Sequence, residues 1–235
     1  MELGMDEMTK NLWQSIVKSP MTHKPPERKR QDKKHKLVLA AKALVYKKGF
    51  SETTLADIAH QADVPLGNVY YYFKTKEAIG LAVIEQRFKE WETWRRKVAT
   101  QPLVLSRLMM FLESFMTLQT DNDFGCPIGH LCQEFAREGG ALGIASRKFL
   151  MSFVAWLEEQ FRLLGLAELS LSTANTFLSL SQGAILLAQT LQEPTIMDNQ
   201  RYFIERWLKQ IDRQNIHTFS SIDMSILRPE LMILE

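Results

Sequence analysis

Apolar residues recur every three or four positions along most of the chain, which is the pattern of helices that bury one face. The first helix is predicted from Glu27 to Lys48, ahead of Gly49, and two short helices follow, from Leu55 to Ala62 and from Leu66 to Phe73. Longer helices are predicted over residues 76–99, 105–116, 127–138, 143–164, 171–192 and 198–214. Since neither a convincing alternating strand pattern nor an internal repeat is found, the sequence predicts an all-α fold.

The two ends of the chain lack this period. Residues 1–26 contain the dipeptides Ser19-Pro20 and Pro25-Pro26, which interrupt regular structure. We therefore expect four parts: a mobile leader over 1–26, a small helical domain over 27–80, a larger helical domain over 81–214 and a tail over 215–235.

The composition is that of a soluble globular protein, with 46% hydrophobic and 24% charged residues. No segment approaches the roughly 18 uncharged apolar residues that a membrane-crossing helix needs. The acidic residues near the start differ from the basic start of a signal peptide. Two cysteines are too few for a disulfide scaffold and fit a reducing compartment. We expect a cytoplasmic protein with no cofactor and no metal site.

Basic charge is concentrated near the N-terminus. Residues 24–50 contain ten of the 29 Lys and Arg residues and only two acidic ones, whereas the formal net charge of the chain is +2. Such a cluster is either a solvated helix face or a contact surface for a polyanion, meaning nucleic acid or an anionic membrane. Charge alone does not choose between these interpretations.

The two short helices predict a helix-turn-helix. Thr54 is a suitable N-cap residue, and Asp57 provides a weak form of the capping box. A helix of two turns is unstable by itself, so it must pack against its neighbours. Asp63 stands where a tight turn requires a residue that tolerates positive φ, and Pro65 can open the next helix. Two short helices around a sharp turn form this motif.

The third helix carries residues that suit contacts with DNA bases. Val69 and Phe73 are expected to point into the small core, and Tyr71 is expected to cover it. Asn68 can form two hydrogen bonds with adenine, and Leu66 can contact a thymine methyl group. The residues expected to face outward are Leu66, Gly67, Asn68, Tyr70 and Tyr72.

Lys76 lies in the first turn of the fourth helix, where Thr75 is the predicted N-cap. The helix dipole disfavours a cation at this end. Lys76 is therefore either a solvated side chain that tolerates a modest cost or part of a phosphate site completed by the helix N-terminus.

These residues together resemble the DNA-binding domain of TetR/AcrR-family transcriptional regulators over residues 32–82. The shared features stand at fixed spacing and are Gly49-Phe50, Thr53-Thr54, Ile58-Ala59, Ala62, Val64, Gly67, Tyr70, Tyr72-Phe73 and Lys76-Glu77. Two positions differ from the family pattern. Asp63 replaces the glycine usual in the turn, and Pro65 replaces the usual serine or threonine, which removes a hydroxyl that could contact phosphate.

The resemblance implies a repressor that a small-molecule effector releases from a near-palindromic operator in double-stranded DNA. The residues nearest the bases of the major groove would be Leu66, Gly67, Asn68 and Tyr70. Those that hold phosphates would be Thr54, Tyr72 and Lys76. A basic arm like the one that some members lay on the DNA backbone or in the minor groove would consist of Arg28, Lys29 and Arg30.

By the same resemblance, the remaining helices bind the effector and form a homodimer. The apolar faces of 171–192 and 198–214 suit either an intramolecular core or a four-helix bundle with a second copy. Met and Phe are frequent between 88 and 161, which suits a core or a pocket for an apolar or aromatic ligand. The candidate ligand-binding residues are Phe88, Met109, Phe115, Cys126, His130, Gln133, Phe153 and Gln182.

Residues 125–135, GCPIGHLCQEF, resemble a GCxxGxxxxE stretch found in a subset of TetR-family regulators. Pro127 suits the first helical position, which makes Cys126 the N-cap, and a helix N-terminus lowers the pKa of a thiol. Cys126 is thus either a reactive sensor of electrophiles or a small N-cap residue. Cys132 lies about 240° around the helix, so a local disulfide is not expected. Cys126, His130 and Glu134 could alternatively form a metal-binding face.

Two other classes of function compete with the regulator. A cysteine-dependent enzyme would use Cys126 as nucleophile and His130 as base, but the sequence has no recognisable oxyanion donors and no Gly-rich phosphate loop. A helical adaptor would use the basic cluster to contact an acidic protein or a membrane. We predict that the chain is not an enzyme.

Overall fold

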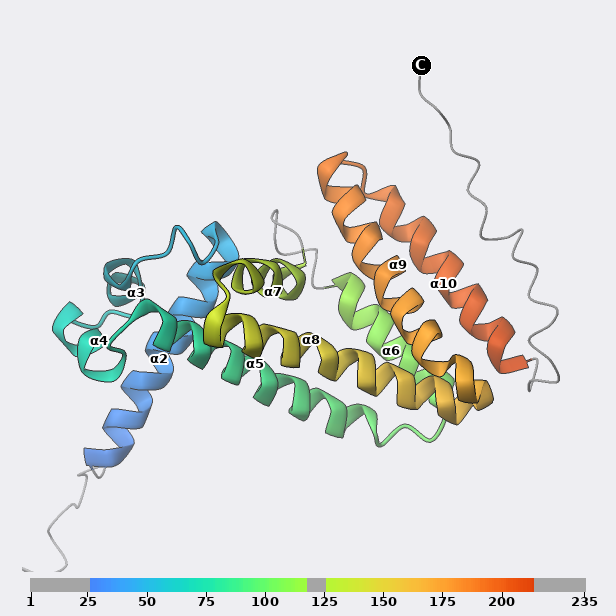
Figure 1. Ribbon diagram of the computed structural model, residues 1–235, viewed down its shortest axis with the longest axis horizontal. Coiled ribbons are helices and arrows are strands. Elements are labelled where there is room, and N and C mark those ends of the chain that lie inside the picture. The colour runs from blue at the N-terminus through green and yellow to red at the C-terminus, as the bar shows by residue number, and fades with distance from the viewer. Residues whose placement is uncertain (1–25, 118–125, 214–235) are drawn as a thin grey trace, which may run out of the picture. The chain divides into compact units, whose positions relative to one another are not determined.

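The computed structural model describes residues 26–117 and 126–213, apart from the side chains of residues 26–30, Thr117 and Arg213. Within this part the protein is all-helical, as predicted (Figure 1). The helices are α2 (Pro26–Lys48), α3 (Leu55–Gln61), α4 (Leu66–Tyr72), α5 (Lys76–Val98), α6 (Val104–Thr117), α7 (Pro127–Glu138), α8 (Gly140–Phe161), α9 (Ser170–Thr190) and α10 (Thr195–Arg213). Two short turns, η1 (Arg162–Leu166) and η2 (Ala167–Leu169), join α8 to α9. The predicted tail lies outside the described residues, and so does the predicted leader except Pro26, which begins α2.

One continuous apolar cluster extends from Leu37 to Ile211. The described residues 26–36 belong to a separate unit, in which the side chains of 31–36 are exposed. The predicted boundary between residues 80 and 81 lies inside α5, whose buried residues Ile79 and Val83 stand on either side of it. The domain limits over 27–80 and 81–214 therefore stay predictions.

A polar cap stabilises α3, and a small apolar core holds α3 and α4. The Thr54 Oγ1 accepts a hydrogen bond from the Asp57 N–H (3.1 Å), and the Asp57 Oδ2 accepts one from the Thr54 N–H (2.8 Å). This capping box is complete rather than weak, and it stabilises a helix too short to form by itself. Asp63 has a φ of 53°, as expected of the turn. Pro65 is the N-cap of α4 rather than its first residue.

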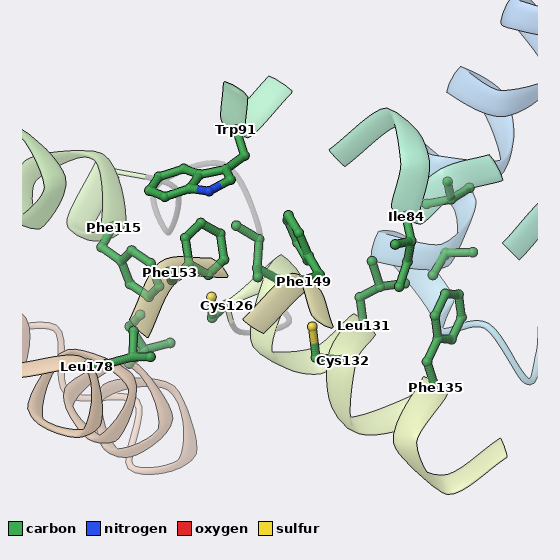
Figure 2. Close-up of a cluster of buried hydrophobic side chains, with 14 of the residues drawn as sticks. Ile84, Trp91, Phe115, Cys126, Leu131, Cys132, Phe135, Phe149, Phe153 and Leu178 are labelled. Atoms are coloured by element: carbon green, nitrogen blue, oxygen red, sulfur yellow. The ribbon is translucent and has the colours of Figure 1, made fainter. Parts of the chain in front are cut away.

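The helices from α5 to α10 form a helical body around an aromatic core. α8 packs against α7, α9 and α5, and α10 packs against α9 and α6. Trp91 meets Phe153 edge to face with ring centroids 4.4 Å apart, and Phe111 stacks on Trp156 at 5.4 Å. Figure 2 shows Trp91, Phe115 and Phe153 close together in this core. Such aromatic pairs add to the stabilisation from burial.

Within the span Gly140–Thr190, a window of 18 residues has the mean hydropathy, 1.2, of a membrane-crossing segment. The span is not one continuous α-helix, because Gly165 and Ala167 have φ values of 87° and 23°. α8 and α9 pack against each other on either side of this break. Its apolar residues include Phe161 and Phe177, which are buried in the core.

Candidate DNA interface and effector site

α4 presents apolar and polar side chains to solvent. Leu66, Tyr70 and Tyr71 are 42%, 48% and 58% exposed, whereas Val69 is fully buried. A Cβ placed on Gly67 would meet no atom within 4 Å, so another backbone can approach there. Exposed apolar residues gathered on one short helix are typical of a contact surface.

Tyr71 and Tyr72 lie in the reverse of their expected environments, core for Tyr71 and solvent for Tyr72. The prediction that Tyr71 covers the core is wrong, because Tyr71 is exposed and Tyr72 packs against the core. At about 100° per residue, Tyr71 lies on the side of α4 opposite to Val69 and Phe73, and Tyr72 lies nearer to them. The two tyrosine rings contact each other edge to face, with centroids 5.0 Å apart.

Thr54 and Lys76, the predicted phosphate contacts, both have partners inside the protein. The Thr54 hydroxyl donates to the Asp57 Oδ2 at 2.7 Å. The Lys76 Nζ donates to the Ser51 carbonyl at 2.7 Å and lies 4.8 Å from the centroid of the Phe50 ring. Because an ammonium has three protons, Lys76 retains donors for a phosphate, whereas the single Thr54 hydroxyl proton is engaged. The carbonyl contact also accounts for a cation in the first turn of α5.

Lys48 and Asp57 form an ion pair that the sequence analysis did not predict. The Lys48 Nζ lies 2.6 Å from the Asp57 Oδ2 and ties the end of α2 to the start of α3. Hydrogen bonds from Lys48 and Thr54 hold the pKa of Asp57 well below its usual range, because they favour the charged carboxylate. In the sequence, the only indication of this ion pair was the acidic residue in the first turn of α3.

The predicted basic arm lies in α2. Arg28, Lys29 and Arg30 belong to this helix, but their side chains lie outside the described part of the structure. Their contact with DNA stays a prediction.

The eight candidate ligand-binding residues fall into two groups. Phe115, Cys126 and Phe153 are buried in the core of the helical body (Figure 2), and three others are partly buried, namely Phe88, Met109 and Gln182. His130 and Gln133 have exposed side chains on α7. The structure therefore does not bring these last two together with the buried group.

Cys126 is the N-cap of α7, as predicted. Its Sγ accepts hydrogen bonds from the Gly129 N–H and from the Gln182 Nε2, both at 3.4 Å. A Cβ on Gly129 would lie 2.8 Å from the Gln182 Oε1, so glycine permits the close approach of α9. Cys126 thus joins the start of α7 to the middle of α9.

Cys132 lies in apolar surroundings (Figure 2). Burial raises the pKa of its thiol to about 12. Both cysteines are free thiols. Cys132 is therefore protonated and unreactive at neutral pH.

Cys126 and His130 do not form a nucleophile–base pair. The His130 Nε2 lies 3.5 Å from the Glu134 Oε2, and the imidazole is 45% exposed, whereas Cys126 is buried. Among the described residues, no group of three His, Cys, Asp or Glu side chains could hold a metal ion.

Two of the buried donors in the helical body that have no hydrogen-bond partner in the described structure lie close together. They are the Arg87 Nε and the Trp91 Nε1, one turn apart on α5. The Arg87 Nη1 donates to Glu90 at 2.7 Å, and burial lowers the pKa of this guanidinium. Unpaired buried donors are costly, so an acceptor on a bound molecule would be stabilised here. The apolar pattern of the sequence did not identify this pair.

Residues 37–83, which include α3 and α4, match the family of bacterial regulatory proteins described as the tetR family. This match, together with the similarities that follow, supports a TetR-family transcriptional regulator. TetR-family regulators bind operator DNA and small-molecule effectors and act as dimers.

The similarity to individual regulators extends beyond this region. The chain is 28% identical over 176 residues to an uncharacterized HTH-type transcriptional regulator in the lacX 3′ region of Lactococcus lactis, covering 71% of this chain and 88% of the relative. It is 33% identical over 57 residues to the repressor NemR of Escherichia coli, covering 24% of this chain and 29% of NemR.

Solved structures share the fold. A TetR regulator from Legionella pneumophila has a TM-score of 0.68 at 22% identity, covering 80% of this chain and 99% of that protein. Reduced NemR has a TM-score of 0.64 at 21% identity, covering 74% of this chain and 97% of NemR.

Proposed function

We propose that this TetR-family regulator is a dimeric cytoplasmic repressor that binds a near-palindromic operator and is released by a small-molecule effector. The observation that carries the proposal is the exposed face of α4, where Leu66 and Tyr70 project from a helix anchored in the core through Val69. In a helix-turn-helix, such a face enters the major groove.

The proposed DNA contacts divide by their partner. Those to bases are made by Leu66, Gly67, Asn68 and Tyr70. Those to the DNA backbone are made by Thr54, Tyr72, Lys76 and the arm of Arg28, Lys29 and Arg30. For Thr54, both the hydroxyl proton and the backbone N–H donate to the Asp57 Oδ2, so a phosphate contact would require one of these bonds to be given up. Two recognition helices in a dimer would lie roughly 34–36 Å apart.

The dimer is proposed to form through α9 and α10. Leu186, Leu191 and Tyr202 are 65%, 62% and 62% exposed on these helices. A groove between the two helices includes Gly183, which has no neighbour within 4 Å of a built Cβ, and Gln200, whose buried Nε2 has no partner in the described structure. Both features suit close packing of a second copy.

The opposite face of the same two helices packs within one chain, as in the alternative of an intramolecular core. The residues buried within one chain there include Phe177, Leu178, Ile185, Ile204 and Leu208. The dimer would therefore use the outer faces of α9 and α10 and leave this core intact.

The effector is proposed to bind in the helical body near Cys126. Phe115 and Phe153 would contact an apolar or aromatic molecule, while Gln182 and the Trp91 N–H would meet its polar groups. An electrophile is one class to test, because Cys126 lies in this cluster (Figure 2). Effector binding would favour a conformation whose α5 holds the two recognition helices at the wrong spacing.

Capture of genomic DNA tests the proposal. Purified protein is mixed with fragmented genomic DNA at roughly physiological salt, and the retained fragments are sequenced. We expect a discrete near-palindromic site. Uniform retention would contradict sequence-specific recognition and favour an adaptor that binds polyanions through charge alone.

A further inference from the structure

Glu134, on α7, contacts the turn that joins α2 to α3. Its Oε2 accepts a hydrogen bond from the Phe50 N–H at 2.7 Å, and its Oε1 accepts a longer one from the Ser51 N–H at 3.4 Å. The Glu134 side chain is only 14% exposed, so water competes little for these bonds. A carboxylate that accepts backbone N–H groups makes charge-assisted bonds, which are stronger than neutral ones.

Gly49 makes this contact possible. Its φ is 85°, and a Cβ there would lie 2.8 Å from the Glu134 Oε1, so a larger residue would both strain the backbone and displace the carboxylate. The other side of the turn is also tied, because Thr53 donates to the Gly49 carbonyl and Lys76 to the Ser51 carbonyl, each at 2.7 Å. The turn is therefore a well-braced unit that α7 holds through Glu134.

Apolar packing reinforces the contact. The Phe50 ring meets the Phe135 ring edge to face, with centroids 4.7 Å apart, and a Cβ on Gly80 of α5 would lie 2.9 Å from the Phe50 ring. α3 begins only a few residues after this turn, and it packs against α4. The position of the turn therefore determines the position of α3 and, through it, of α4, the proposed recognition helix.

The N-terminal end of α7 contacts α9. There Cys126 accepts a hydrogen bond from Gln182 of α9, and Gly129 lies against the same side chain. Cys126 and Glu134 are separated by about 12 Å along one uninterrupted helix. A displacement of α7 at the α9 contact would be transmitted to Glu134.

We infer that Glu134 is a positioning residue for DNA binding, which holds the α3–α4 unit where a dimer fits both half-sites of one operator. The inference rests on the proposed function. Without the carboxylate, the Phe50 and Ser51 N–H groups lose their acceptor and the α3–α4 unit moves over a wider range. Operators with other half-site spacings then compete better with the natural one.

Spacing variants of the operator test this role. Glu134→Ala and Glu134→Gln are compared with wild type and with Glu138→Ala, which removes the same charge from an exposed position one turn further along α7. Affinity is measured for the operator found by genomic capture and for copies with a base pair inserted at the centre. We expect Glu134→Ala to bind the natural operator about tenfold more weakly and to lose most of its preference for that spacing.

Glu134→Gln keeps one carbonyl oxygen for the Phe50 N–H, so it should retain an intermediate preference. Glu138→Ala should behave like wild type. Equal weakening on every spacing by Glu134→Ala would overturn the inference, because a general loss of stability acts that way. If Glu134→Ala does not fold, as judged by thermal unfolding, the preference of Glu134→Gln decides in its place.

Amide exchange at Phe50 and Ser51 gives a readout that needs no DNA. Both amides should exchange faster in Glu134→Ala than in wild type and in Glu138→Ala. Unchanged exchange would overturn the inference. A wild type that prefers no DNA sequence would contradict the proposed function alone, and the exchange rates would still decide whether Glu134 holds the turn.

Discussion

The recognition region, residues 55–72, and the helical body from α5 to α10 place their candidate functional residues in opposite environments. Leu66 and Tyr70 are exposed, and the fully buried Val69 beside them packs in the core. In the helical body, Phe115 and Phe153 are candidates for effector binding and are themselves buried in the core. The residues proposed for function thus differ from those that stabilise the fold in the first region and coincide with them in the second.

The nature of the two ligands explains this difference. DNA is larger than the domain that reads it, so a convex helix face can make the contact from outside. A small effector must be enclosed to bury most of its surface, so its site consists of side chains that otherwise pack against one another. Substitutions should therefore separate binding from stability only in the recognition region.

The largest effect is expected in the helical body. Phe153→Ala should lower the free energy of unfolding by about 3–5 kcal/mol, because it leaves a cavity in the aromatic core. Denaturant unfolding followed by circular dichroism measures this loss. Met151→Ala, on the same helix at 60% exposure, is the control and should change stability by less than about 0.5 kcal/mol. Similar values for the two variants would show that Phe153 does not support the core.

Substitutions on α4 should show the opposite behaviour. Asn68→Ala and Tyr70→Ala should each weaken operator binding by about 1–3 kcal/mol. Their free energies of unfolding should stay within about 0.5 kcal/mol of wild type, because neither side chain is part of the core. Fluorescence anisotropy at fixed salt measures binding, with Gln61→Ala at an exposed position of α3 as control. A loss of stability as large as the loss of binding would remove the contrast between the two regions.

A smaller effect is expected where the recognition region does depend on a polar residue. Thr54→Ala should lower the free energy of unfolding by about 1 kcal/mol, because it removes the N-cap of α3. Thr54→Ser retains the hydroxyl and should recover most of this loss in thermal unfolding. If the serine variant is as unstable as the alanine variant, the hydroxyl cap is not the cause.

The smallest effect concerns pH. The pKa of Asp57 is held well below its ordinary value of 3.8 by Lys48 and Thr54. The folded carboxyl therefore binds a proton more weakly than the unfolded one, so its stabilisation is complete above about pH 4 and is lost as the pH falls. Asp57→Asn should lose less stability than wild type between about pH 5 and pH 3. Identical losses in thermal unfolding over this range would show that the ion pair and cap contribute nothing measurable.

Features that depend on neighbouring residues could be predicted from the sequence. The end of α2 at Gly49, the cap at Thr54 and the positive φ of Asp63 all follow from local backbone geometry. Assigning Tyr71 to the core was wrong because three successive tyrosines have equal polarity, and only their angles relative to Val69 separate them. In the helical body, an apolar period marks which residues are buried but not which of them line a ligand site.

The sequence by itself determined the helices, the helix-turn-helix and the resemblance to TetR regulators, because helical period, caps and turn residues are short-range properties. Only the tertiary structure decided that Glu134 binds the Phe50 N–H, 84 residues away, and that Gln182 contacts Cys126, 56 residues away. Such contacts depend on how the helices pack against one another. The periodicity of each helix tells which face is buried, but many arrangements of the same helices would bury those faces equally well.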